Sequence, residues 1–224
     1  MAALANDFIK DRKAGTSYGN TILHRYLGSV KWVKNSTTGA DLKRFREMIS
    51  FFRKYGDQYD LPYLLVAAQA YQESGLNQGV KSSAGAVGVM QIKPGTAAGH
   101  PIRIQNVHRL DNNIHAGVKY LRFLLDQYYK DEPMDRVNRG LFAVASYNAG
   151  PARIQQLRRK AREQGLDPNR WFNNVEVVAA KEIGRETVQY VSNIYKYYLA
   201  YQMVTKSTEA RRMTLDKTKR ITKQ

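Results

Sequence analysis

Glu73-Ser74-Gly75 and, a few residues later, Ser82-Ser83-Ala84-Gly85-Ala86-Val87-Gly88-Val89-Met90-Gln91 decide the fold of this chain. The residues just before them, 61–72, are mostly apolar, and we expect a helix that Asp60 caps and that carries Pro62 in its first turn. Glu73 then lies at the end of an apolar helix, where water solvates a carboxylate poorly. Poor solvation raises the pKa of a carboxyl group. The sequence therefore predicts a carboxyl that is protonated near neutral pH and can act as a general acid.

Four motifs occur in order within residues 58–204: Glu73-Ser74, Gly88-Val89-Met90-Gln91-Ile92, Ala145-Ser146-Tyr147-Asn148-Ala149-Gly150 and Glu186-Thr187-Val188-Gln189-Tyr190-Val191. Each motif alone is a weak signal, but four in order at matching spacing are specific. On these motifs the chain resembles the soluble-lytic-transglycosylase family, which is related to goose-type lysozymes. It is most similar to the subgroup of membrane-bound lytic murein transglycosylases F through three further stretches: 52–56, 112–121 and 195–198.

The resemblance implies a mostly α, lysozyme-like helical domain in which a small loop or hairpin carries the second motif. It also implies an enzyme, a peptidoglycan lytic transglycosylase that acts as a carbon–oxygen lyase on the cell-wall polysaccharide. Such an enzyme cleaves the β-1,4 bond between N-acetylmuramic acid and N-acetylglucosamine without water and forms 1,6-anhydro ends. Two alternatives stay open: a goose-type muramidase that hydrolyses the same bond, and a non-catalytic glycan-binding or assembly module.

Residue by residue, the motifs place the catalytic acid at Glu73. The resemblance assigns substrate-site positions to five other residues, with the serine also contacting the catalytic acid: Ser82, Gln91, Tyr147, Asn148 and Tyr190. Plainer roles are available for three of them. Ser82 can satisfy a turn, Tyr147 can be a core tyrosine, and Asn148 can end a helix.

A second carboxylate is not assigned, and the roles of Glu176, Glu182 and Glu186 are left open. Ordinary glycosidases use two carboxylates, set about 5 Å or roughly 6.5–9.5 Å apart. The resemblance implies a single catalytic glutamate, with assistance from the substrate's N-acetyl group. The C6 hydroxyl of muramic acid then replaces water as the nucleophile.

The chain divides by pattern into three parts. Residues 1–40 form an N-terminal extension, which the resemblance interprets as the end of a preceding solute-binding-like domain. Residues 41–204 form the catalytic domain, and residues 205–224 form a basic, mobile tail. Apolar spacing and turn residues predict helices over the following ranges: 41–52, 61–72, 111–125, 136–148, 151–163 and 175–204.

The formal net charge of +17 favours a polyanionic partner. Peptidoglycan carries carboxylates on its peptides, and an anionic membrane surface is a second candidate. The basic residues are spread along the chain without a recognition motif, so no nucleic acid is expected. His24, His100, His108 and His115 include no pair at helical ligand spacing, so neither a metal nor a cofactor is implied.

The chain has no cysteine and no apolar run of about 18 residues, so no transmembrane helix or disulfide is expected. Its first residues also lack the pattern of a signal peptide. The resemblance nevertheless implies an exported protein that is periplasmic or associated with the outer membrane. We therefore expect the chain to be a piece of a longer protein, without its signal. The oligomeric state is not predicted.

Overall fold

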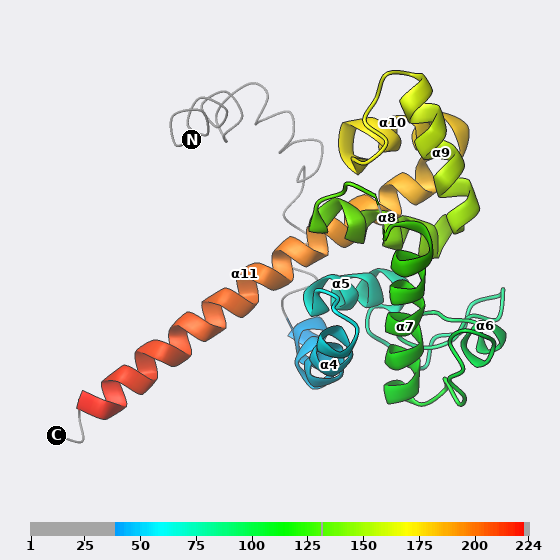
Figure 1. The fold of residues 1–224 in the computed structure, drawn as a ribbon. Helices are drawn as coiled ribbons and strands as arrows, with labels where there is room; N and C mark the ends of the chain where they lie inside the picture. Colours follow the sequence, from blue (N-terminus) through cyan, green and yellow to red (C-terminus); the bar gives the residue numbers. More distant parts are fainter. Residues whose placement is uncertain (1–38, 131, 222–224) are drawn as a thin grey trace, which may run out of the picture.

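The computed structural model describes residues 39–130 and 132–221, with side chains up to Thr208. This part of the chain is built from helices, so the expected mostly α class is confirmed (Figure 1). In chain order they are α4 (Gly39–Gln58), α5 (Tyr63–Ser74), α6 (Pro94–Ala98), α7 (Leu110–Tyr128), α8 (Arg136–Ala149), α9 (Pro151–Glu163), η1 (Trp171–Val175), α10 (Glu176–Glu182) and α11 (Arg185–Ile221). All but the last two residues of the predicted N-terminal extension lie outside the described residues.

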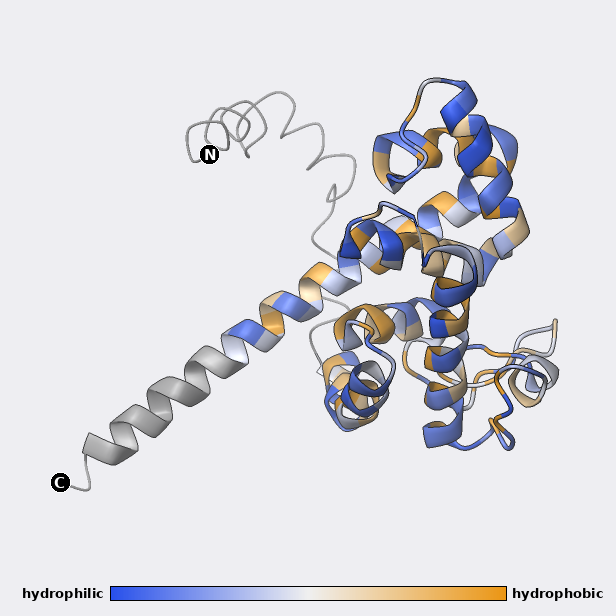
Figure 2. Cartoon of the chain, viewed as in Figure 1, coloured by the Kyte–Doolittle hydropathy of each residue, from blue (hydrophilic) through white to orange (hydrophobic). Residues whose placement is uncertain are grey.

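Helix α5 is the centre of the fold because it is apolar on every side. Every residue from Leu64 to Ala70 is buried, as expected for a helix enclosed by others. In Figure 2, α5 is mostly hydrophobic, whereas the outer helix α9 is mainly hydrophilic. The expected cap was wrong: Pro62 holds the N-cap position without a side-chain bond, and Asp60, two residues earlier, pairs with Arg136 instead.

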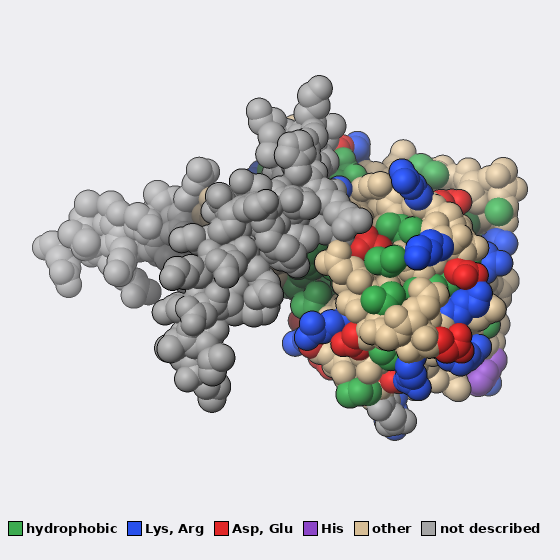
Figure 3. Space-filling view, turned by 90° about the horizontal axis from the view of Figure 1, so that it is seen from above, with side chains coloured by type: hydrophobic (Ala, Val, Ile, Leu, Met, Phe, Trp, Pro, Cys, Tyr) green, Lys and Arg blue, Asp and Glu red, His purple; other side chains and the backbone are tan. Residues whose placement is uncertain are grey.

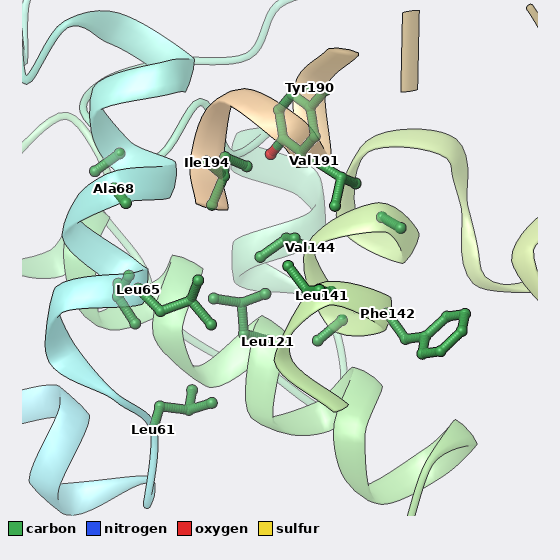
Figure 4. Packing of buried hydrophobic residues seen from close by; sticks show 14 of the residues in the cluster. Leu61, Leu65, Ala68, Leu121, Leu141, Phe142, Val144, Tyr190, Val191 and Ile194 are labelled. Atoms are coloured by element: carbon green, nitrogen blue, oxygen red, sulfur yellow. The ribbon is translucent and has the colours of Figure 1, made fainter. Parts of the chain in front are cut away.

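The main hydrophobic core gathers side chains from α5 and from the helices packed with it, among them α4, α7, α8 and α11. Helix α4 packs on α5 through a buried face that includes Phe45, Met48 and Phe52, and α11 packs against both α5 and α8. Figure 4 shows side chains of these elements meeting, among them Leu65 of α5, Leu121 of α7, Val144 of α8 and Ile194 of α11. The buried face of α7 includes residues at helical spacing: Ile114, Val118, Leu121 and Leu125.

The second motif lies in a long irregular segment between α5 and α7, as expected for a loop or small hairpin. Two isolated bridges, Lys81 with Val87 and Val87 with Ile92, give it a hairpin-like turn. The short helix α6 follows. The segment covers a second, smaller apolar cluster: Val87, Ile92, Ala97, Ile102, Val107 and Ala116. The loop is therefore packed on a core of its own.

The C-terminal region differs from the single helix predicted over 175–204. Gly184 adopts a φ of +81°, a left-handed conformation that glycine tolerates and that separates α10 from α11. Helix α11 then continues to Ile221 and leaves the body of the molecule (Figure 1). No glycine or proline occurs after Gly184 to end it. Within residues 39–130 and 132–221, no helix has the length and apolar content needed to cross a bilayer.

Candidate active site

Glu73 lies in the last turn of α5, half-buried at the edge of the main core. Burial raises the pKa of its carboxyl from the usual 4.5 to about 7, against a smaller lowering by the hydrogen bond from Tyr190 and by the nearby side-chain amide of Gln69. The direction is the one that the apolar helix predicts. At neutral pH the carboxyl is therefore divided between a form that can donate a proton and a form that can accept one.

Tyr190, in the first turns of α11, is the direct partner of Glu73. Its hydroxyl donates a hydrogen bond of 2.5 Å to Oε1 of Glu73. The tyrosine side chain is only 7% exposed, and burial, with the nearby Glu73 charge, raises the pKa of its phenol well above the ordinary value. Tyr190 thus stays protonated and remains a hydrogen-bond donor at any pH at which the protein works.

Tyr147, near the end of α8, lies on another side of the same site. Its hydroxyl donates a hydrogen bond of 2.8 Å to the carbonyl oxygen of Met90. Its ring meets that of Tyr120 edge-on, with centroids 5.2 Å apart. Burial first, and then the charge of Glu73, raises the pKa of the Tyr147 phenol. The structure therefore brings Glu73, Tyr147 and Tyr190 together from three helices.

Ser74, a residue that sequence reasoning left without a role, joins α5 to the second motif. Its hydroxyl oxygen lies 3.0 Å from the carbonyl oxygen of Val89 and 3.2 Å from that of Ala70. It also accepts a bond from the backbone N–H of Asn77. Because Ser74 follows Glu73 directly, its bond to the carbonyl of Val89 fixes the loop relative to Glu73.

The side chain of Asn113, in α7, is hydrogen-bonded to the backbone of the same loop. The side chain is fully buried. Its oxygen accepts a bond of 2.8 Å from the N–H of Met90, and its amide donates to the carbonyls of Val87 and Val107 at 2.9 Å. An asparagine among the buried positions of α7 was the available signal in the sequence, since a buried amide is usually hydrogen-bonded.

Gly88 allows this close approach between the loop and α7. Its φ is +76°, and a Cβ atom there would lie 2.5 Å from Nδ2 of Asn113. Only glycine combines a positive φ with the absence of a Cβ atom, so only glycine fits at this position. Met90, two residues later, is fully buried and packs in the main core.

Gln91, in the second motif, helps to shape the loop. Its side-chain amide nitrogen donates bonds to the carbonyls of Val80, at 3.1 Å, and Gly88, at 2.9 Å. Both amide hydrogens are thereby used. Its side-chain oxygen accepts no bond from any residue in the described part of the chain, so it is the atom through which Gln91 can bind a donor.

Ser82 and Asn148 hydrogen-bond to residues other than Glu73. The hydroxyl of Ser82 accepts a bond of 3.0 Å from the N–H of Ala86 within its own turn; among the described residues it makes no hydrogen bond to Glu73. The exposed Asn148 accepts a bond of 2.9 Å from the hydroxyl of Thr187. It therefore joins the end of α8 to the start of α11.

The three glutamates that were left open lie in separate environments. Glu182 pairs with Lys160 at 2.5 Å. Glu176 is buried and accepts a bond from the N–H of Asn173, and Glu186 is exposed in the first turn of α11. Among the described residues, no other carboxylate contributes to the pKa shift of Glu73, which results from burial, the hydrogen bond from Tyr190 and the nearby amide of Gln69.

The arrangement supports proton transfer by one group beside a rigid loop. In the described ranges, no three histidine, aspartate or glutamate side chains gather as a metal site would require. The carboxyl of Glu73 can release and take up a proton near neutral pH. The side-chain oxygen of Gln91 can accept from a polar ligand.

Comparison with known sequences identifies a matching family. The family model described as transglycosylase SLT domain matches residues 50–169. The membrane-bound lytic murein transglycosylase F of Desulfosudis oleivorans is 33% identical over 170 residues, which are 70% of this chain and 36% of the relative. That of Shewanella frigidimarina is 27% identical over 213 residues, 88% of this chain and 44% of the relative. The chain thus spans less than half the length of these two relatives.

Solved structures show the same fold. The 70 kDa soluble lytic transglycosylase of Escherichia coli superposes with a TM-score of 0.54 at 28% identity, covering 70% of this chain and 24% of that one. An inactive mutant of the lytic transglycosylase Slt from Pseudomonas aeruginosa gives a TM-score of 0.52 at 23% identity, with the same coverage. These likenesses agree with the helical, lysozyme-like architecture expected from the sequence.

Proposed function

Since the chain belongs to the transglycosylase SLT domain family, we propose that it is a peptidoglycan lytic transglycosylase. It cleaves the β-1,4 bond between N-acetylmuramic acid and N-acetylglucosamine without water and leaves 1,6-anhydro ends. The observation that carries this proposal is the half-buried carboxyl of Glu73, whose pKa is raised to about 7 by burial. Relatives named membrane-bound lytic murein transglycosylase F support the same activity.

The first step is acid catalysis by Glu73. The protonated carboxyl donates to the glycosidic oxygen, and positive charge develops on the muramic acid ring as the bond breaks. The hydroxyl of Tyr190, at 2.5 Å from the carboxyl, stabilises the carboxylate that this step leaves behind.

The second step reverses the role of the same residue. The Glu73 carboxylate accepts the proton of the C6 hydroxyl, whose oxygen attacks the anomeric carbon and closes the 1,6-anhydro ring. One residue can serve both steps because its pKa lies close to the working pH. A second carboxylate, which water-using glycosidases need, is not required. This fits a pKa of Glu73 that no neighbouring carboxylate in the described residues perturbs.

The loop and the tyrosines would hold the sugar. Gln91 offers a side-chain oxygen to a hydroxyl or N-acetyl N–H of the substrate. The hydroxyl of Tyr147 donates a hydrogen bond of 2.8 Å to the carbonyl oxygen of Met90. This bond fixes the position of the tyrosine ring beside Glu73. We assign Ser82 and Asn148 to the outer parts of the site, where their bonds to Ala86 and Thr187 fix backbone turns.

Product analysis tests the proposal. Purified sacculi are digested and the soluble fragments are weighed by mass spectrometry. A transglycosylase gives ends that lack one water relative to reducing ends, and Glu73→Gln gives no fragments. Reducing ends would make the protein a goose-type muramidase. Sacculus binding without fragments, by the unaltered chain, would make it a glycan-binding or assembly module.

The proposed partner is the glycan strand of peptidoglycan, whose peptide carboxylates complement a net charge of +17. Figure 3 shows lysine and arginine side chains interspersed with acidic and apolar ones on one face, not gathered into a band as a nucleic-acid groove would require. We place the protein outside the cytoplasm, in the periplasm or at an outer membrane, as a part of a longer exported chain. Residues 41–204 are its catalytic domain, which contains the matched range 50–169.

A further inference from the structure

Gln69 is a polar residue inside the apolar helix α5, and it faces the candidate site. It precedes Glu73 by one helical turn, so the two side chains share a face of the helix. Its side chain is 0% exposed. Neither its amide nitrogen nor its amide oxygen makes a hydrogen bond of normal geometry within the described residues. A buried, unpartnered amide lowers stability, so a packing role alone does not account for glutamine at this position.

The side-chain amide of Gln69 lies beside the Glu73 carboxyl and the Tyr190 hydroxyl. It lies close enough to the Glu73 carboxyl and the Tyr190 hydroxyl to lower the pKa of both groups. A donor lowers the pKa of an acid by binding its charged form. The Tyr190 hydroxyl already occupies Oε1 of Glu73. Gln69 is therefore available as a second hydrogen-bond donor to the Glu73 carboxylate, which water solvates poorly.

We propose that Gln69 is a positioning residue for Glu73: its side-chain amide donates a hydrogen bond to the carboxylate that forms when Glu73 gives up its proton. The bond strengthens as the negative charge develops, because charge-assisted hydrogen bonds are stronger than neutral ones. It holds the carboxylate in place for the proton it must next accept. The catalytic consequence rests on the proposed function; the contact itself does not.

A titration of the unaltered protein tests the contact directly. The side-chain NH₂ signals of Gln69 are followed by ¹⁵N NMR between about pH 5 and about pH 9. We expect a downfield step of the amide protons with its midpoint at the titration of Glu73, and no such step in Glu73→Gln. Signals that stay constant while Glu73 titrates would overturn the proposal. This measurement needs no activity, so an inactive protein would refute the proposed function and leave the contact decided separately.

The variant Gln69→Leu separates positioning from packing. We expect an unchanged or higher Tm, because an unpartnered amide is replaced by an apolar group of similar size. We also expect kcat on sacculi to fall about tenfold with KM within about twofold. The alkaline limb of the activity profile moves to higher pH, because Glu73 releases its proton less readily. Wild-type kcat with an unmoved limb would overturn the proposal.

Gln189→Leu is the matched control. Gln189 precedes Tyr190 in α11, but its side chain is exposed and donates to Asn193. The same change of residue type there leaves kcat and the pH profile as in the unaltered protein. If Gln69→Leu does not fold, Gln69→Met replaces it, and the NMR titration of the unaltered protein decides the contact in either case.

Discussion

The hydroxyl of Tyr190 lies 2.5 Å from Oε1 of Glu73, although 117 positions separate the two residues in the chain. The bond joins the end of α5 to the start of α11. It places a permanent donor on a carboxyl that burial keeps near its midpoint at neutral pH. The start of the last helix is thus a part of the site, and the two steps proposed for Glu73 depend on this contact.

Removing the hydroxyl in Tyr190→Phe should raise the pKa of Glu73 further, because the bond with Tyr190 lowers it. The alkaline limb of activity on sacculi should move to higher pH, and kcat should fall about tenfold, as for loss of a bond to a charged group. Tyr195→Phe on the same helix is the control, since its hydroxyl makes no hydrogen bond to a described residue. A pH profile of Tyr190→Phe that matches the unaltered protein would contradict the assigned contact.

The raised pKa of Glu73 also makes stability depend on pH. The folded pKa of Glu73, about 7, exceeds the ordinary 4.5. The free energy of unfolding is therefore unaffected by this carboxyl below about pH 4.5, and it falls as the pH rises from there through 7. Glu73→Gln carries no charge in either range. Between pH 5 and pH 8 the unaltered protein should lose about 2.5 kcal/mol relative to Glu73→Gln, so the Tm of Glu73→Gln should rise relative to that of the unaltered protein by about 5–10 °C over this range. A Tm difference that stays constant over this range would count against a sheltered carboxyl.

Ser74→Ala should loosen the second motif from α5. The variant loses the bond to the carbonyl of Val89, and we expect the free energy of unfolding to fall by about 1 kcal/mol in urea titrations. Activity should fall as well, because the loop is no longer fixed beside Glu73. The exposed Ser83 provides the control, and Ser83→Ala should change neither quantity. Equal behaviour of the two variants would remove the role assigned to Ser74.

Asn113→Ala should be the most destabilising of these changes. Three bonds from a fully buried side chain are lost, and the N–H of Met90 is left unpaired inside the protein. We expect the free energy of unfolding to fall by about 3 kcal/mol. The neighbouring Asn112 donates one bond, to the carbonyl of Gln105, and Asn112→Ala should lose about 1 kcal/mol or less. Similar losses in both variants would show that the loop does not depend on Asn113.

Much of the fold follows from local pattern. The apolar faces of α4 and α7 were predictable because 3.6-residue spacing decides which side of a helix is buried. Helix α9 has the predicted bounds, since Pro151 can only begin a helix and Gly165 follows its end. The break at Gly184 was missed because a glycine can also lie inside a helix, and only its neighbours decide which conformation it takes.

The site was predictable in part. Glu73, Tyr147 and Tyr190 lie together, as the motifs implied. Gln69 and Asn113 were not found, although both are polar residues at buried helical positions. The sequence shows that such a residue is unusual for its position, but its partners lie on other elements and cannot be inferred from spacing alone. The same limit applies to Ser82, whose hydroxyl bonds its own turn.

The central claim is that Glu73 holds its proton near neutral pH. Carboxyl ¹³C NMR tests this most directly, with the Glu73 signal assigned by its absence in Glu73→Gln. We expect a midpoint of about 7, set by burial against the opposing effects of the Tyr190 hydroxyl and the Gln69 amide. A midpoint close to the ordinary 4.5 would show a carboxylate fully solvated by water and would contradict the mechanism proposed for this protein.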